Sequence, residues 1–257
     1  MPATAIPREQ LLQQLDEERQ QLSRGREVIE RLPRVTRWRS SDGTHHAVCF
    51  SALDESCADA VIDEQIAHYR ELGNEFEWKM YAHDRPTDLI ERLRRRGFEI
   101  GPCEAVMLFD LSIRAGWIDK SDACRVARIE REDQIPAFRR VAEKVFGKDY
   151  GFTSKELAEA LRRGATDHVG YVAYDGEQPV SIGRLYTHPQ SWFAGLYGGE
   201  TVATHRGRGF YRAVVAARAR DAIAAGAKYL SVDALPTSRP ILERMGFEWL
   251  TDTWPCT

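Results

Sequence analysis

Two arginines and two glycines stand together in residues 206–211, RGRGFY, which follow an extended run and open an expected helix over residues 210–225. The first backbone N–H groups of a helix have no intrahelical partner, and the helix dipole places partial positive charge there. Glycine lets the backbone approach a ligand closely, and arginine adds full positive charge. This combination predicts a binding site for a phosphate or pyrophosphate group. A tight turn with solvated arginines is the alternative interpretation.

Other phosphate-binding motifs fit this stretch less well. A Walker A loop requires Gly-Lys-Ser/Thr, which the sequence lacks here. A dinucleotide fingerprint, G-x-G-x-x-G, is met by Gly207 and Gly209, but its third glycine is replaced by Arg212. Asp233 ends the next expected strand and would suit that fingerprint. However, too few residues follow to build the remaining parallel strands of a dinucleotide-binding domain.

The stretch resembles motif A of the GNAT N-acetyltransferase superfamily, R/Q-x-x-G-x-G/A. Arg206 takes the first position and Gly209 the fourth, whereas Tyr211 stands where the family usually has glycine or alanine. Residues 240–247, PILERMGF, resemble motif B, a short helix that ends in Gly-Phe. The two motifs occur in the family's order, with a helix and a strand between them. The resemblance covers roughly residues 124–257.

The resemblance implies a site for acetyl-CoA as the acyl donor, with its pyrophosphate at the turn and its pantetheine along the preceding strand. The cofactor-binding residues that it implies are Thr201, Val202, Arg206, Gly207, Arg208, Gly209, Phe210, Tyr211 and Arg212. In the family, the region of residues 147–152 shapes the acceptor pocket, so Tyr150 and Phe152 are candidates to line it. Arg212 is the helix arginine expected to reach the phosphates, while Arg218 and Arg220 are expected on a solvated helix face.

Acetyl transfer to an amine requires a neutral amine, donors for the tetrahedral oxyanion, and a proton for the departing thiolate. Three glycines inside the expected strand over residues 192–204 predict a bulge or a close backbone approach. They are Gly195, Gly198 and Gly199. A bulge frees backbone N–H groups from the ladder. We therefore hypothesise that residues 199–202 pair with pantetheine and stabilise the oxyanion.

The sequence offers more than one candidate for each catalytic role. Some family members use a glutamate as the base on the strand after the motif A helix, but Ser231 holds the matching position here. Glu200 and Asp233 are the candidate bases, with water or another residue as the alternative. The family's motif B tyrosine, a common acid, is matched by Leu242, which leaves Tyr197 or Tyr211 as the candidate acid. A thiolate also leaves without a specific acid.

The expected reaction is acetyl transfer from acetyl-CoA to a primary amine of a small molecule or a protein. The alternatives are an acyl-CoA-binding module of the same fold without turnover, a relative that takes its acyl group from charged tRNA, and a dinucleotide oxidoreductase. A tRNA-dependent relative would carry a basic groove, and the net charge of −3 disfavours it.

Composition sets further limits. The 257 residues are 43% hydrophobic and 29% charged, which suits a globular protein of one or two domains. Five scattered cysteines predict free thiols in a cytoplasmic protein, and no Cys/His cluster has the spacing of a metal site. There is no apolar run of membrane-spanning length and no signal-peptide pattern. We expect neither membrane nor nucleic-acid partners, and a homodimer remains open.

The chain contains a weak internal repeat. Residues 58–72, 78–81 and 89–99 follow the order helix, strand and short helix with Gly-Phe-Glu, as do residues 210–225, 229–232 and 241–248. In the first half, the anion-binding turn is replaced by residues 54–57, DESC, whose carboxylates would repel a pyrophosphate. Coincidence of common short elements is the alternative.

The predicted fold is therefore α+β, a GNAT-like mixed but mainly antiparallel sheet flanked by helices, in two tandem halves. The predicted domains are residues 1–112, a degenerate GNAT-like half, residues 113–123, a linker, and residues 124–257, the acetyltransferase half. Helices are expected over residues 8–32, 58–72, 87–96, 134–146, 154–163 and 210–225. Strands are expected over residues 35–39, 46–51, 76–81, 105–111, 125–129, 169–174, 180–186, 192–204 and 229–233, with the last strands over 248–255.

Overall fold

The computed structural model describes residues 6–22, 28–40, 42–113, 115–119, 124–147 and 151–257. Tyr150 and the side chain of Phe152 lie outside the described parts, so their predicted place at an acceptor pocket stays a prediction. The chain forms two compact units: one comprises Met1–Met107 and Asp233–Thr257, and the other comprises Leu108–Val232. The boundaries between the units fall within two strands of one 11-stranded sheet, and the strands of each unit are described separately below.

The sheet of the first unit has the strand order β1-β2-β3-β4-β11-β5. These strands are β1 (Val28–Arg31), β2 (Val35–Arg39), β3 (His46–Ser51), β4 (Glu77–Tyr81), β11 (Glu248–Cys256) and β5 (Glu104–Asp110). β2 pairs with β1 and β3 in antiparallel fashion, whereas β3 and β4 are parallel. A parallel pair needs a crossover connection, and the long helix α2 (Ala58–Leu72) supplies it.

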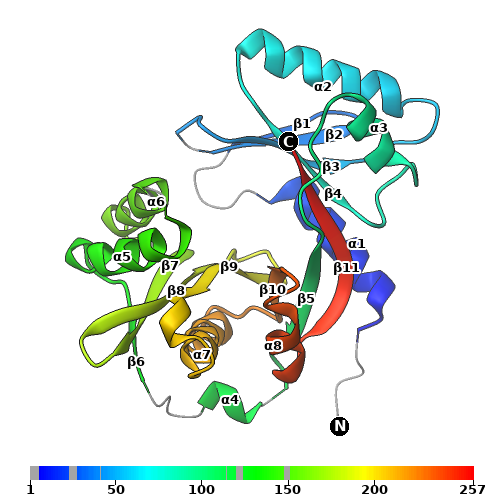
Figure 1. Cartoon of the computed structure of the whole chain (residues 1–257). Helices are drawn as coiled ribbons and strands as arrows, with labels where there is room; N and C mark the ends of the chain where they lie inside the picture. The colour runs from blue at the N-terminus through cyan, green and yellow to red at the C-terminus, as the bar shows by residue number, and fades with distance from the viewer. Residues whose placement is uncertain (1–5, 23–27, 41, 114, 120–123, 148–150) are drawn as a thin grey trace. The chain divides into compact units, whose positions relative to one another are not determined.

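Two helices cover one face of this sheet and enclose the core of the first unit. α2 contributes Val61 and Ile62, and α3 (Leu89–Arg95) contributes Leu89 and Leu93, to the same apolar cluster as Trp78 of β4. The opposite face carries α1 (Arg8–Gln21), whose Arg19 guanidinium lies 3.8 Å from the centre of the Tyr81 ring. The unit also holds the short helix α8 (Arg239–Arg244) (Figure 1).

The strand β11 pairs with β4, a partner that the sequence analysis did not predict. The two strands are antiparallel, with Thr253 opposite Tyr81 and Cys256 opposite Trp78. The Thr253 hydroxyl donates to the Met80 carbonyl at 2.8 Å, and both the threonine and Cys256 are fully buried. The end of the chain is therefore an interior strand of the first unit's sheet.

The sheet of the second unit has the order β10-β9-β8-β7-β6. These strands are β6 (Arg125–Arg128), β7 (His168–Asp175), β8 (Gln178–Tyr186), β9 (Phe193–Thr201) and β10 (Tyr229–Ala234). All neighbours are antiparallel except β9 and β10, which are parallel and flank the crossover helix α7 (Phe210–Ala224). The expected α+β fold with a mainly antiparallel sheet is confirmed.

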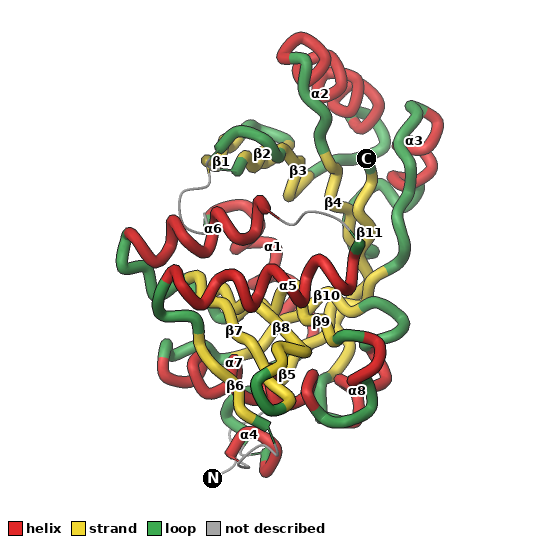
Figure 2. Tube along the Cα trace, turned by 60° about the vertical axis from the view of Figure 1, so that its left-hand side comes forward, coloured by secondary structure: helices red, strands yellow, loops and turns green. Residues whose placement is uncertain are grey.

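Helices cover both faces of the second sheet (Figures 1 and 2). α5 (Ile135–Phe146) and α6 (Gly151–Arg162) pack on one face, where Ile182 of β8 joins their apolar residues. The next residue of β8, Gly183, faces α7 on the other side, because successive strand residues point to opposite faces. The short helix α4 (Gly116–Asp119) packs against α7, since Arg220 donates to the Ile118 carbonyl at 2.7 Å.

The expected helix over residues 8–32 is wrong beyond Gln21. α1 ends there, and Val28–Arg31 form β1 instead, with Val28 opposite Arg39 and Ile29 opposite Trp38. Valine and isoleucine suit a pleated strand, and pairing with β2 outweighs the helical spacing of the preceding leucines. None of the described helices combines the length and the apolar character that crossing a membrane requires.

Candidate functional site

The glycine- and arginine-rich turn lies between β9 and α7, as the sequence predicts. The single helical turn η2 (Ala203–His205) follows β9, and Gly209 then precedes the first residue of α7 with φ of 89°, a left-handed conformation that favours glycine. No side chain caps this helix, and its first turn contains no acidic residue. The first helical bond runs from Ala213 N–H to the Gly209 carbonyl at 3.0 Å. The N–H groups without an intrahelical acceptor are those of Phe210, Tyr211 and Arg212.

Three arginines surround this helix start. Arg206 is folded back, with its Nε donating to the Thr201 carbonyl at 3.1 Å. Arg208 forms an ion pair with Asp175 at 2.8 Å. Arg212 is exposed and has no hydrogen bond or ion pair to any described residue. The helix start therefore presents N–H groups and positive charge together, which is the environment that an anionic phosphate requires.

The predicted bulge is present in β9. Glu200 lies opposite Ile182 and Tyr197 lies opposite Arg184, so two residues of β9 stand against the single Gly183 of β8. These two residues are Gly198, with φ of 54°, and Gly199. A bulge leaves the extra residue outside the ladder of the two strands.

On its other edge, β9 pairs with β10 along only part of its length. The parallel register of β9 with β10 ends at the pair Gly195 and Ser231. The rest of β9, through Thr201, runs beyond that register. The parallel register thus ends three residues before the bulge, so regular strand pairing is interrupted on both edges of this stretch of β9.

Tyr211 departs from the motif, and the facing strand compensates for it. A Cβ atom on Gly199 would lie 2.9 Å from Cε2 of the Tyr211 ring. Real side chains do not approach so closely, so glycine at position 199 makes room for tyrosine at position 211. Burial raises the pKa of Tyr211, an effect that the nearby Arg218 guanidinium opposes.

The candidate base Glu200 is half-buried on β9, immediately before the end of the strand. Burial raises the pKa of its carboxyl group, and the positive charge of Arg206 partly opposes that shift. A raised pKa brings a carboxylate closer to the range in which it accepts a proton efficiently near neutral pH. The candidate acid Tyr197 lies on the same strand, is 36% exposed, and meets Tyr186 edge to face with ring centres 5.1 Å apart.

The other sequence-predicted residues have structural partners. Asp233 lies in the first unit, where its carboxylate is 3.2 Å from the Lys79 ammonium group. Thr201 is buried, and its hydroxyl meets the Ser181 hydroxyl at 2.8 Å. The Val202 N–H group donates to the Val180 carbonyl at 2.9 Å. Leu242, which stands at the family's tyrosine position, is fully buried in α8.

The prediction that Arg218 lies on a solvated helix face is wrong. It is 1% exposed and lies beneath the bulge, whereas Arg220 is exposed as expected. The helical spacing indicates a buried position for Arg218, because it follows Val214 by four residues and Tyr211 by seven, on the face that packs against the sheet. The charge of arginine led to the prediction of an exposed position. The glycines that make room for Arg218 lie in the strands β8 and β9 and not in its own helix.

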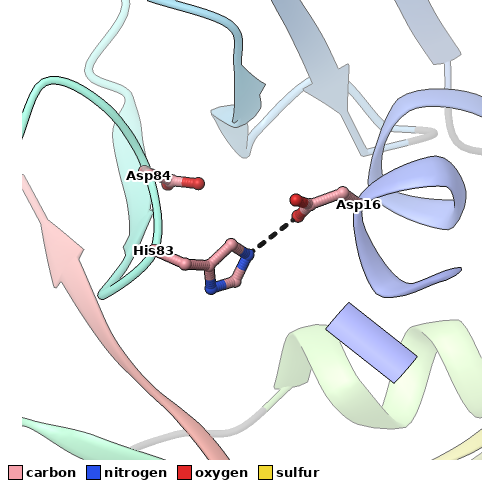
Figure 3. Close-up of side chains that lie close together, drawn as sticks. All are labelled: Asp16, His83 and Asp84. Atoms are coloured by element: carbon pink, nitrogen blue, oxygen red, sulfur yellow. Dashed lines mark hydrogen bonds and ion pairs between the residues drawn. The ribbon is translucent and has the colours of Figure 1, made fainter. Parts of the chain in front are cut away.

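A polar cluster in the first unit was not predicted. His83 Nε2 lies 3.0 Å from Asp16 Oδ1, and Asp84 lies beside them (Figure 3). These groups are close enough to hold a metal ion, but Arg19 binds both carboxylates, at 2.7 Å from Asp16 and at 3.0 Å and 3.1 Å from Asp84. The buried guanidinium already supplies the positive charge that a metal ion would bring. The cluster therefore secures α1 against the loop after β4.

The fold is GNAT-like, as the motifs indicate. A GCN5-related N-acetyltransferase from Kribbella flavida superposes with a TM-score of 0.62 and 13% identity, over 97% of this chain and 93% of that protein. A conserved protein of unknown function from Staphylococcus epidermidis ATCC 12228 gives a TM-score of 0.67 and 13% identity, over 90% and 93%. A tandem GNAT protein of the clavulanic acid biosynthesis pathway gives 0.59 and 11%, over 91% and 83%. Neither a family model nor a curated protein matches the sequence.

Proposed function

We propose that the protein is an acetyl-CoA-dependent N-acetyltransferase that acts on a primary amine. The observation that carries this proposal is the uncapped, arginine-flanked start of α7 directly beyond the bulged end of β9, within a GNAT-like fold. A helix start without a side-chain cap or an acidic residue favours an anion, and a bulged strand beside it offers peptide groups to an extended ligand.

In this proposal, the pyrophosphate of acetyl-CoA binds the N–H groups at the start of α7, with charge supplied by Arg206, Arg208 and Arg212. Arg212 is suited to this role because no described residue occupies its guanidinium. Pantetheine extends along β9 toward Thr201 and the bulge. Acetyl-CoA would supply the acetyl thioester, and the residues of this chain would orient it for attack by the amine.

The chemistry follows from that arrangement. The neutral amine attacks the thioester carbonyl carbon, and the carbonyl electrons move to oxygen. When the carbonyl re-forms, the C–S bond breaks, and the thiolate accepts a proton. We propose that Glu200 is the base that removes the proton from the amine nitrogen, directly or through water, because its carboxyl is half-buried with a raised pKa, whereas Asp233 is engaged by Lys79. Tyr197 and Tyr211 are the proposed proton donors for the thiolate.

Calorimetric titration with acetyl-CoA tests the proposal. Wild type should bind, and the double variant Arg206→Ala, Gly209→Glu should not, because it removes a cation and places a carboxylate at the helix start. Glutamate at a φ of 89° also strains the backbone, so thermal unfolding must show that the variant is folded. The matched control is Arg140→Glu on α5, which packs on the opposite face of the sheet. Failure of wild type to bind acetyl-CoA, CoA and longer acyl-CoAs alike would falsify the proposal.

A binding module without turnover is the second candidate. Ser231 and the buried Leu242 take the places where GNAT enzymes commonly carry a glutamate and a tyrosine. Both candidates predict binding of acetyl-CoA, so a screen of amines that detects released CoA thiol separates them. Release with any amine above the background with buffer supports the enzyme, and binding with no release from a broad amine panel supports the module.

A further inference from the structure

Arg218 is a fully buried cation without a carboxylate partner among the described residues. It lies in the middle of α7, and its side chain is 1% exposed. Its Nε donates to the Val214 carbonyl of the same helix at 3.3 Å. Its Nη2 is buried and has no hydrogen-bond partner. Burial without an anion lowers the pKa of this guanidinium.

The bulge of the neighbouring strands is shaped around this guanidinium. A Cβ atom on Gly183 would lie 2.8 Å from Cζ of Arg218, and one on Gly199 would lie 3.2 Å from its Nη2. Neither strand has room for a side chain at these positions. The arginine thus favours glycine at position 183, and the Tyr211 ring together with the arginine favours it at position 199.

The guanidinium contacts the two peptide carbonyls that flank the bulge. Its Nη1 is 3.2 Å from the Arg184 carbonyl and 3.5 Å from the Tyr197 carbonyl, and these two residues are paired across β8 and β9. The Tyr197 carbonyl belongs to the peptide group that leads into Gly198. Positive charge at a peptide carbonyl polarises that peptide and makes its N–H a stronger donor.

Burying a guanidinium in this way is expensive for folding alone. A methionine or leucine would fill a similar volume without the cost of desolvating a charge, and carbonyl groups return only part of that cost. Buried charge at a site where negative charge develops is, in contrast, the arrangement that stabilises such charge most effectively. The position of Arg218 directly behind the bulge therefore points to a role in the reaction.

We propose that Arg218 is a positioning residue that fixes the bulge of β9 and polarises its peptide groups, so that they stabilise the oxyanion formed from the thioester. This inference rests on the proposed function. When the amine nitrogen bonds to the carbonyl carbon, the electron pair of the C=O bond moves to oxygen, and the polarised peptides meet that charge. The oxygen then re-forms the carbonyl as the C–S bond breaks. Arg218 itself neither touches the substrate nor transfers a proton.

The stretching frequency of the bound thioester carbonyl tests this role without an amine acceptor. Acetyl-CoA labelled with ¹³C at the carbonyl is bound to each protein, and isotope-edited infrared spectra are compared with the free compound. Wild type should lower the frequency, because polarising donors weaken the C=O bond. Arg218→Met, which removes the charge and keeps an apolar stem, should lose most of that shift while it still binds CoA. Arg218→Lys, which keeps a positive charge, should retain a larger part of the shift.

Two further variants keep the test decisive. Arg218→Gln is neutral but still offers a hydrogen bond to a carbonyl, so it replaces the methionine variant if that protein fails to fold. Arg220→Met on the exposed side of the same helix is the control and should keep the wild-type shift. A wild-type shift in a folded neutral Arg218 variant that binds acetyl-CoA overturns the inference. Absence of acetyl-CoA binding by wild type instead overturns the proposed function, which calorimetry detects separately.

Discussion

The starts of α2 and α7 form a direct comparison between the two units. Both helices have 15 residues and connect a parallel pair of strands, β3 with β4 and β9 with β10. Before α2, Asp54 accepts hydrogen bonds from the N–H groups of Ser56 and Cys57 at 2.9 Å and 3.0 Å. Before α7, Gly209 offers no side chain. No side chain caps either helix, but the turn before α2 holds a hydrogen-bonded carboxylate, whereas the turn before α7 carries two arginines and no acidic residue.

The strands that precede these helices, β3 and β9, also differ between the two units. The residue before the last of β9 is Glu200, and the corresponding residue of β3 is Phe50. Both strands carry a bulge, but the bulge of β9 consists of two glycines, whereas the extra residue of β3 is Cys49. The same succession of elements thus carries polar groups suited to chemistry in one unit and packing in the other. That the first unit is a degenerate GNAT-like half stays a prediction, and the comparison of the two helix starts offers ways to test it.

The largest expected effect concerns Glu200, which has no counterpart on β3. Glu200→Gln should lower turnover about 100-fold, because a positioned general base contributes that much or more. The carboxyl pKa is raised above its ordinary value of 4.5, so wild-type activity should fall as the pH falls through that raised value and the base becomes protonated. The variant should lack this acid limb. The measurement is turnover against pH with an amine found by the screen, and an unchanged profile contradicts the assignment.

The next effect tests the charge at the start of α7. Arg212→Glu reverses the charge of the unoccupied arginine in the first helical turn and should weaken acetyl-CoA binding about tenfold. Arg70→Glu in α2 makes the same change in the first unit and should leave binding unchanged. Calorimetric titration measures both. Equal weakening by the two variants would mean that net charge, and not the helix start of the second unit, governs affinity.

A third variant removes the built-in anion of the first unit. Hydrogen bonds from Ser56 and Cys57 hold the pKa of Asp54 below its ordinary value of 3.8. A lowered folded-state pKa means that the carboxylate stabilises the fold above pH 3.8 and that this contribution is lost as the pH falls through the lower folded value. Asp54→Ala should therefore lower the melting temperature at pH 7, and the gap from wild type should narrow in acid.

The control for Asp54→Ala is Glu64→Ala on the exposed side of α2, which should change the melting temperature less. Acetyl-CoA binding should be the same in both variants and in wild type. A loss of binding in Asp54→Ala alone would show that the first helix start also takes part in the cofactor site, which would remove the contrast between the units.

The smallest effect concerns the carboxylate beside the second helix start. Asp175 pairs with Arg208 and lies 3.4 Å from His205 Nε2. Asp175→Asn should free Arg208 for phosphate and strengthen acetyl-CoA binding by up to about threefold, because the pair is partly exposed and its Coulomb energy is modest. Glu177→Gln removes a charge from the same hairpin and should have no effect. Weaker binding by Asp175→Asn would show that Asp175 positions Arg208 and does not compete for it.

Local patterns predicted much of the fold. The limits of α2 and the start of α7 agree with the sequence, since hydrophobic spacing and flanking glycines fix both locally. The strand β1 was mistaken for helix because its pairing with β2 outweighs local spacing. The pairing of β11 with β4 joins segments far apart in the chain, which no local pattern reveals.

In the candidate site, too, local sequence patterns could be predicted, whereas contacts between distant segments could not. The turn at residues 206–211 and the glycines of β9 could be recognised, because the motif needs residues that are neighbours in sequence. Arg218 could not be placed beneath the bulge from its residue type, since three separate elements create its pocket in the packing. The partner of Asp233 was equally hidden, because Lys79 comes from β4.

The position of β11 has a consequence for the synthesis of the protein. In the first unit's sheet, β11 lies between β4 and β5, yet the ribosome makes it after every residue of the second unit. Until β11 has been made, the edge of β4 at Trp78 and Met80 lacks the strand that contains Cys256, which pairs with it in the folded protein. The second unit can fold during translation, whereas the first unit must wait for the last strand. An exposed edge of this kind recruits other strands, so chaperone binding to ribosome-bound chains is expected to persist until β11 emerges.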